Sequence, residues 1–259
     1  APWIIWDINS IEDAIDYAEK KGIKLTVTKE KIYSRDQNLW HISHEGGDIE
    51  QLENEHNEEV LYMMVTPPER AKDTPTYVDI TFEKGWPVKV DGESLSPATL
   101  LQKLNKIAGE NGVGVADIVE NRIVGMKSRG IYETPGGTLL MESLMELETI
   151  VFDKDTLNFK KLVSQKYAEI AYNGQWFTPI KYALDAFVDS IDEVLTGTIK
   201  LKLYKGHIKI AGRFTENALY DEGISSFGSS ELYSHKDAEG FIKLFSLPNT
   251  IRAYKKLSK

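Results

Sequence analysis

The chain has 259 residues, of which 41% are hydrophobic and 27% charged, a globular composition that excludes a largely disordered protein and suits one large domain or two small ones. It contains no cysteine, which excludes disulfides, thiolate zinc sites and cysteine nucleophiles. Its formal net charge is −9 and its Lys and Arg residues form no basic block, so nucleic acid is disfavoured as a partner because phosphate contacts need a basic surface.

Neither a membrane segment nor a secretory signal is visible in the sequence. No apolar run approaches the roughly 20 residues that a membrane helix needs, so we expect no membrane partner. The first ten residues, APWIIWDINS, lack the basic region and apolar core of a signal peptide, and together with the missing cysteine they favour a cytoplasmic protein. The chain also begins without Met on an apolar stretch, which we interpret as the interior of a larger protein.

The first predicted element is a helix. Ser10 and Asp13 form a capping-box pattern in front of apolar residues at helical spacing, and Gly22 is placed to end this helix. The next segments are predicted as a strand, a polar loop with a solvated acidic run, and a strand that two prolines stop: residues 23–28, 29–60 and 61–66.

Two segments, residues 77–90 and 197–214, predict β-hairpins. In each, apolar and polar residues alternate on both sides of a short turn. The predicted turns are Lys84-Gly85 and Lys205-Gly206.

Helices are predicted where Ser-Pro or Thr-Pro pairs stand at a helix start, or where apolar residues recur at helical spacing. They begin at Ser96-Pro97 and Thr178-Pro179, span about 138–152 and 156–171, and resume after Pro248. Because hairpins mix with helices without strict alternation, we predict an α+β fold with a mixed or antiparallel sheet, packed helices and a C-terminal helical arm.

General motif searches identify no cofactor or metal site. There is no phosphate-loop or dinucleotide signature, and Gly112-Val113-Gly114 is too short to count as one. His41 and His44 lie near acidic residues, but no helix is predicted there to hold ligands on one face. We therefore predict no metal site.

Two polar segments are open to both a structural and a functional interpretation. YSRDQNLWHISHEGG (33–47) is either a loop of turn-forming residues or a set of donors and acceptors for a zwitterionic small molecule. In an extended segment, Glu120 and Arg122 share a face, as either an ion-pair ladder or a grip on a guanidino, ureido or amino group. Tyr132 adds a hydroxyl beyond a turn predicted at Arg129-Gly130.

The same segments resemble the argininosuccinate synthase family. DIVENRIVGMKSRGIYETPGGTLL (117–140) is similar to that family's most distinctive run, and YSRDQNLWHISHEGG (33–47) resembles a second signature. Further similar runs are YAEIAYNGQWFTP (167–179), VDGESLSPATLLQKLNKIAGENGVG (90–114) and GFIKLFSLP (240–248). The resemblance extends over essentially the whole chain, with departures at Val115, Ala116 and Ala218.

The resemblance covers only the later part of the family. The family's N-terminal nucleotide-binding domain holds ATP on a Ser-Gly-Gly loop, and no Ser-Gly-Gly occurs in these 259 residues. The chain thus resembles a synthetase domain, residues 1–238, followed by an oligomerisation arm, residues 239–259. The resemblance implies a homotetramer built partly through this arm, and a partner in the nucleotide-binding domain.

The resemblance also implies a reaction and a set of contacts. The family joins citrulline and aspartate in arginine biosynthesis and the urea cycle, using ATP with Mg²⁺ and forming a citrullyl-adenylate. The implied citrulline contacts are Ser34, Ser43, Glu120 and Tyr132, with Glu120 suited to the α-ammonium group. No catalytic residue is assigned, and ATP and aspartate contacts are expected outside this chain.

Three hypotheses follow for the chain as a whole. The main one is part of an ATP-dependent ligase, inactive without its ATP-binding domain. The second is a catalytically inactive binding or assembly module of the same fold. An RNA-binding protein is disfavoured by the net charge. For Arg122, Lys127 and Arg129 we predict structural ion pairs.

Overall fold

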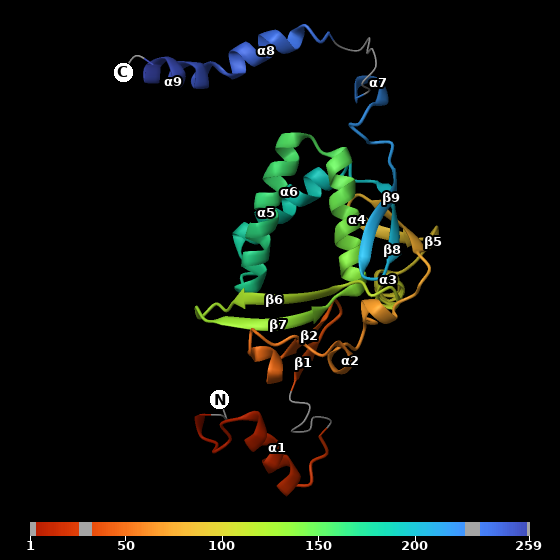
Figure 1. The fold of residues 1–259 in the computed structure, drawn as a ribbon, viewed down its shortest axis with the longest axis vertical. Helices are drawn as coiled ribbons and strands as arrows, with labels where there is room; N and C mark the ends of the chain where they lie inside the picture. Colours follow the sequence, from red (N-terminus) through yellow and green to blue (C-terminus); the bar gives the residue numbers. More distant parts are fainter. Residues whose placement is uncertain (1–3, 26–32, 226–233, 258–259) are drawn as a thin grey trace. The chain divides into compact units, whose positions relative to one another are not determined.

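The structure is a computed structural model that describes residues 4–25, 33–225 and 234–257 (Figure 1). The chain divides into two compact units, residues 1–217 and residues 218–259. The predicted boundary between a synthetase domain and an arm at residue 239 stays a prediction. Among the helices in the described ranges, none combines the length and apolar character needed to cross a membrane.

The elements of the first unit are α1 (Ile11–Lys20), β1 (Ser34–Gln37), β2 (Ile42–Glu45), η2 (Gly47–Glu50), α2 (Glu58–Leu61), η3 (Pro68–Arg70), β3 (Thr76–Glu83), β4 (Trp86–Val90), β5 (Glu93–Ser94), α3 (Pro97–Glu110), β6 (Val115–Asn121), β7 (Lys127–Glu133), α4 (Pro135–Val151), α5 (Lys154–Tyr172), α6 (Pro179–Asp192), β8 (Gly197–Tyr204) and β9 (His207–Phe214). The second unit contains α7 (Glu222–Ser225), α8 (Asp237–Phe245) and α9 (Leu247–Leu257).

Two antiparallel sheets organise the first unit. One has four strands in the order β1-β2-β7-β6, and the other has five in the order β5-β4-β3-β8-β9. The β6–β7 hairpin forms the long pair of arrows in Figure 1. Antiparallel sheets beside packed helices confirm the predicted α+β class.

The main core lies between the five-stranded sheet and helices α3 and α4. Strand β3 contributes Val78, Ile80 and Phe82, which alternate with less buried neighbours as the sequence predicts. Strand β8 and the two helices complete this core through residues that include Leu104, Leu139, Leu147, Ile199, Leu201 and Leu203. Removing this apolar surface from water is the main source of stability.

Both predicted hairpins are confirmed, and their turns have the expected geometry. Lys84 and Gly85 have φ values of 49° and 76°, and Lys205 and Gly206 have values of 43° and 82°. Two consecutive positive φ values are typical of the turn that matches the right-handed twist of paired strands. The Lys-Gly pairs therefore fix the register of both hairpins.

The predicted helices are also confirmed, with small changes at their ends. The Ser10 side chain accepts a hydrogen bond from the Asp13 backbone N–H, and Ser96 caps α3 in the same way. The C-terminal helix begins at Leu247, because Pro248 occupies a first-turn position that needs no backbone N–H. It is preceded by α8, in which the rings of Phe241 and Phe245 stack at 5.1 Å.

The strand predicted at residues 61–66 is wrong. Leu61 ends the short helix α2, and the following residues form no strand. The backbone N–H groups of Met63, Met64 and Val65 all donate to the carboxylate of Glu133 instead of to a neighbouring strand. The buried carboxylate of Glu133 thus accepts the backbone hydrogen bonds that a neighbouring strand would accept if this apolar run were a strand.

Three other local predictions need correction. The loop predicted over residues 29–60 contains β1 and β2, two strands of a sheet, and all four residues of β1 are exposed. Of the strand predicted at 23–28, residues 23–25 form no strand, and the remainder lies outside the described residues. The turn predicted at Arg129-Gly130 lies instead at residues 122–126, where Gly125 has a φ of 91° and its N–H donates to the Arg122 carbonyl.

A polar cluster is buried beneath helices α4, α5 and α6. Lys160 forms an ion pair with Glu148 at 2.5 Å, and the Glu148 side chain is 4% exposed. Asp192 is half-buried beside this pair, and burial, followed by the charge of Glu148, raises the pKa of its carboxyl to about 6. The native state therefore keeps a proton that the unfolded chain releases near pH 4.

Replacing Asp192 should stabilise the protein in a pH-dependent way. A raised native pKa means that this group's contribution is present at low pH and is lost as the pH rises through about 6. Asp192→Asn should increase the free energy of unfolding by about 1 kcal/mol at pH 8 and by less at pH 5. Urea denaturation at both pH values measures this, with the exposed Asp7→Asn as control. An equal gain at both pH values would contradict the assignment.

Candidate functional site

The register of the four-stranded sheet decides which side chains share a face. Ser43 lies opposite Tyr132, Ser34 opposite Glu45, and Glu120 opposite Ser128. Directly paired residues point to the same side, and residues two apart on a strand do so as well. Ser34, Ser43, Glu120 and Tyr132 therefore all lie on one face, which we call the site face. The opposite side of the same sheet is the reverse face.

Tyr132 and Glu120 converge although twelve residues separate them. The Tyr132 ring lies back along β7 over Gly130, where an added Cβ would stand 2.9 Å from the ring Cε2 and 3.1 Å from the hydroxyl. The ring thus points towards Ser128, the strand partner of Glu120. Burial, followed by the charge of Glu120 and a hydrogen bond to it, raises the pKa of Tyr132 to about 12. Gly130 serves this close approach rather than a turn.

Arg122 ties two carboxylates together at the edge of this face. It forms an ion pair with Glu45, and its Nε lies 3.7 Å from a carboxylate oxygen of Glu120. The nearby Glu45 and Glu120 charges raise the pKa of this guanidinium, with burial acting in the opposite direction. Two carboxylates against one guanidinium leave one surplus negative charge. The structural ion pair predicted for Arg122 is confirmed.

The two serines occupy different settings on the site face. Ser43 is 6% exposed and its hydroxyl makes a long 3.4 Å contact to the Asp36 carbonyl. Ser34 is exposed on the edge strand β1. The ring of His41 meets the Tyr132 ring edge-on at 5.5 Å. The site face thus offers a phenol, two hydroxyls and a carboxylate from strands far apart in the sequence.

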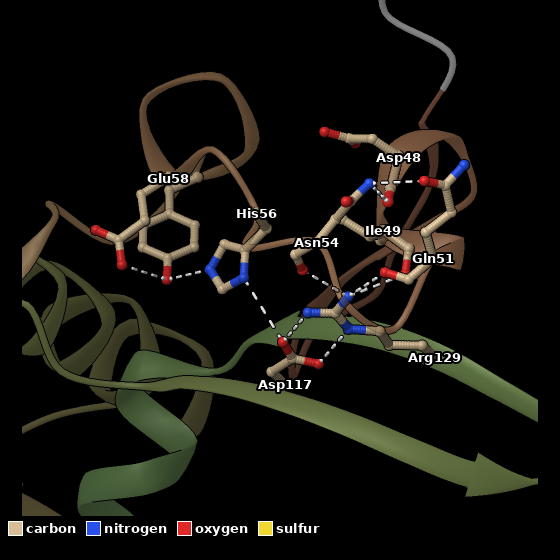
Figure 2. A network of polar contacts seen from close by, with 9 residues as sticks. Asp48, Ile49, Gln51, Asn54, His56, Glu58, Asp117 and Arg129 are labelled. Carbon is tan, nitrogen blue, oxygen red and sulfur yellow. Dashed lines mark hydrogen bonds and ion pairs between the residues drawn. The ribbon is translucent and has the colours of Figure 1, made fainter.

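Arg129 anchors a loop to the reverse face (Figure 2). It pairs with both carboxylate oxygens of Asp117, at 2.9 and 2.6 Å. Its Nη1 donates to the carbonyls of Ile49, Gln51 and Asn54 at 3.0–3.2 Å. The hydrogen bonds from Arg129 hold the pKa of Asp117 below its usual range, against the effect of burial. The ion pair predicted for Arg129 is confirmed.

Asp117 also connects to helix α2 through two aromatic side chains (Figure 2). The Nδ1 of His56 lies 3.6 Å from Asp117, and its Nε2 lies 2.9 Å from the Tyr62 hydroxyl. That hydroxyl reaches Glu58 at 3.4 Å. Lys127, by contrast, donates to the amide oxygen of Asn121 at 2.7 Å and forms no ion pair with a described residue, so its predicted ion pair is wrong there.

The two histidines considered as metal ligands have other partners. His44 is buried on the reverse face and lies 2.8 Å from Glu133, whereas His41 packs against Tyr132 on the site side. In the part of the chain that the structure describes, no group of three or more His, Asp or Glu side chains is arranged to hold a metal ion.

Comparison with known proteins bears directly on the site face. Residues 33–252 match the family described as the arginosuccinate synthase C-terminal domain. That range includes Ser34, Ser43, Glu120 and Tyr132. The chain belongs to the argininosuccinate synthase family.

Individual relatives agree with this family. The chain is 66% identical over 255 residues to the argininosuccinate synthase of Clostridium botulinum strain Langeland, which covers 98% of the chain. It is 62% identical over 259 residues, its whole length, to the argininosuccinate synthase of Clostridium acetobutylicum. The chain spans 64% of the length of each of these curated relatives.

Sequence reasoning did not place several residues around the argininosuccinate synthase signatures on either face of the sheet. Glu45 and Ser128 lie on the site face, and His44 and Glu133 lie on the reverse face. The period-two alternation of strands would have placed Glu45 beside Ser43, once residues 42–45 were assigned to a strand. Val115, which departs from the family pattern, packs half-buried against a small cluster of Ile49, Leu61 and Ile131.

The contact between Glu120 and Tyr132 is measurable as a change in pKa. Glu120→Gln removes the negative charge beside the Tyr132 hydroxyl, so its pKa should fall from about 12 while staying above 10 because burial remains. NMR of tyrosine labelled at Cζ, with the signal assigned by Tyr132→Phe, should show more ionised Tyr132 at pH 11. Glu45→Gln is the control, and an equal or larger shift in that variant would overturn the assignment.

Proposed function

We propose that this chain forms the citrulline-binding part of an argininosuccinate synthase, an ATP-dependent ligase that releases AMP and pyrophosphate. The observation that carries the proposal is the convergence of Glu120 and Tyr132 on one face of the four-stranded sheet. Ser34 and Ser43 lie on that same face. The family resemblance implies these four residues as citrulline contacts.

The polarity of the site face suits a zwitterionic amino acid. Glu120 and Glu45 exceed Arg122 by one negative charge, which favours an α-ammonium group. The Tyr132 hydroxyl donates its single proton to Glu120, so its oxygen remains an acceptor for an ammonium or ureido N–H of the substrate. Ser43 supplies a second hydroxyl whose present hydrogen bond is long. The face therefore matches citrulline in charge and in hydrogen-bonding groups.

In the proposed reaction, this chain positions citrulline. The ureido oxygen attacks the α-phosphorus of ATP and expels pyrophosphate, giving a citrullyl-adenylate, and the aspartate amine then attacks the activated carbon and displaces AMP. Holding the ureido group in the attacking orientation is the contribution expected of the site face. We assign no residue of this chain to ATP, Mg²⁺ or aspartate, because no Ser-Gly-Gly loop occurs in it. Those contacts are proposed for a nucleotide-binding domain.

We also propose that the C-terminal helices join copies of the protein into a homotetramer. In α9, Leu247, Ile251, Tyr254 and Leu257 follow helical spacing and are 47–85% exposed in the single chain. Exposed apolar stripes of this kind are typical of interfaces between subunits. The family resemblance favours a neighbouring subunit over the protein's own first unit.

The proposed role of Glu120 is testable in the full-length protein that carries this chain. Glu120→Gln keeps the shape of the side chain but removes its charge, so the KM for citrulline should rise about tenfold or more. The KM values for aspartate and ATP should change little. Coupled assays of AMP and pyrophosphate release measure all three.

The exposed Glu193→Gln, whose parent side chain is 62% exposed and pairs with Lys84, is the matched control and should behave as the unaltered protein. An unchanged citrulline KM in Glu120→Gln would remove this residue from the site. If the unaltered protein binds citrulline but releases no AMP, the chain is a binding module rather than part of a ligase.

The proposed oligomer predicts a size change on truncation. Removing residues 246–259 deletes the α9 stripe and should lower the mass measured by size-exclusion chromatography with light scattering. Lys256→Ala, a variant that changes charge but keeps the stripe, should retain the parent mass. An unchanged mass after truncation would contradict the interface.

A further inference from the structure

A polar row, exposed at Arg35 and buried at His44 and Glu133, crosses the reverse face behind the proposed citrulline site. Arg35 Nε donates to His44 Nδ1 at 3.2 Å, and His44 Nε2 lies 2.8 Å from Glu133 Oε1. The side chains of His44 and Glu133 are both fully buried. The row connects three adjacent strands, β1, β2 and β7.

Glu133 also anchors a segment outside the sheet. Its carboxylate accepts the backbone N–H groups of Met63, Met64 and Val65 at 2.7–2.8 Å. Burial alone would raise the pKa of Glu133, but the hydrogen bonds from His44 and these three amides together hold it below its usual range. The carboxylate therefore stays ionised in the interior of the protein.

The contacts of His44 select one arrangement of its ring protons. An ionised Glu133 only accepts hydrogen bonds, so Nε2 carries the proton that points to it. Arg35 only donates, so Nδ1 must be a bare acceptor. The neutral ring with its proton on Nε2 satisfies both partners at once. Arg35 and Glu133, the two charged residues of the row, are each hydrogen-bonded to this ring.

Each member of the row directly follows a residue of the site face. Arg35 follows Ser34, His44 follows Ser43, and Glu133 follows Tyr132. Successive residues of a strand point to opposite sides, so a displacement of the row moves the side chains in front of it. The effect is largest for Ser34, because β1 is an exposed edge strand that pairs only with β2 in the sheet.

We propose that Arg35, His44 and Glu133 are positioning residues for the citrulline site, setting where Ser34, Ser43 and Tyr132 stand on the opposite face. This rests on the proposed function of that face. Burying the His44 ring and the ionised Glu133 is costly compared with apolar packing, but their hydrogen bonds accept only one geometry. The row therefore acts on citrulline binding rather than on the chemical step or on the other substrates.

The first experiment compares two replacements of His44 in the full-length protein. His44→Leu fills the space but removes both contacts, so the KM for citrulline should rise at least fivefold with kcat and the KM values for aspartate and ATP within twofold. In His44→Gln, the amide N–H₂ donates to Glu133 and the amide oxygen accepts from Arg35. This variant should recover most of the citrulline affinity.

A matched control separates positioning from loss of stability. Among the described residues, Glu148 is the other buried carboxylate; it lies in α4 and pairs with Lys160 of α5. Glu148→Gln should lower the melting temperature without changing the citrulline KM. If it raises the citrulline KM as much as His44→Leu does, the row has no special role.

A second variant tests the row even where His44→Leu fails to fold. Arg35→Met keeps the His44–Glu133 pair and removes the hydrogen bonds from Arg35 to His44 and to the Val60 carbonyl, so it should raise the citrulline KM several-fold. In a Ser34→Ala background it should have a much smaller effect, because Arg35 acts through Ser34. Equal effects of Arg35→Met in both backgrounds would overturn the proposal.

The two proposals fail in different ways. If Glu120→Gln also leaves the citrulline KM unchanged, the proposed function itself is wrong. If Glu120→Gln raises it while Arg35→Met and His44→Leu change nothing selectively, the citrulline site stands and the positioning row is rejected.

Discussion

The carboxylate of Glu133 is the constraint on which the four-stranded sheet and its surroundings depend. A buried, ionised carboxylate is costly unless its lone pairs are filled, and here four donors fill them. Those donors come from β2 and from residues 63–65. Directly after it, Thr134 donates to the Gly114 carbonyl and α4 begins at Pro135. The Glu133 side chain thereby ties β2 and residues 63–65 to β7, directly before α4 begins.

Both faces of this sheet carry polar side chains, which explains why charge is threaded through residues 112–137. Asp117, Arg129 and Glu133 point to the reverse face, where they are paired and fix loops in place. Glu120 and Tyr132 point to the site face, where their hydrogen-bonding capacity is only partly used. Because strand alternation has a period of two, a slip of one residue would exchange the two sets completely. The pairs on the reverse face therefore protect the register on which the site face depends.

Local sequence signals correctly predicted the helices and hairpins that are determined by residues at their own ends or turns. The helices begin at Ser-Pro or Ser-x-x-Asp patterns, and the hairpins turn at Lys-Gly pairs with positive φ. The failures involve long-range partners. Residues 61–66 have an apolar pattern typical of a strand, but their amides bond a carboxylate 68–70 residues away. Likewise, the partner of Arg122 is Glu45, 77 residues away. Family resemblance selected the four site residues, and pattern alone left both interpretations open.

The site face carries two carboxylates, Glu45 and Glu120, and one guanidinium, Arg122, which makes a close ion pair with Glu45 only. Arg122 pairs closely with Glu45 but stands 3.7 Å from Glu120. At 28% side-chain exposure, Glu120 is accessible from solvent, yet its charge is strengthened by a less polar setting than bulk water. An ammonium group that binds Glu120 would therefore form a close ion pair with this carboxylate without breaking the pair between Arg122 and Glu45. Because Arg122 already pairs closely with Glu45, only Glu120 remains for a proposed ammonium ligand to order, and this favours binding that is selective for charge.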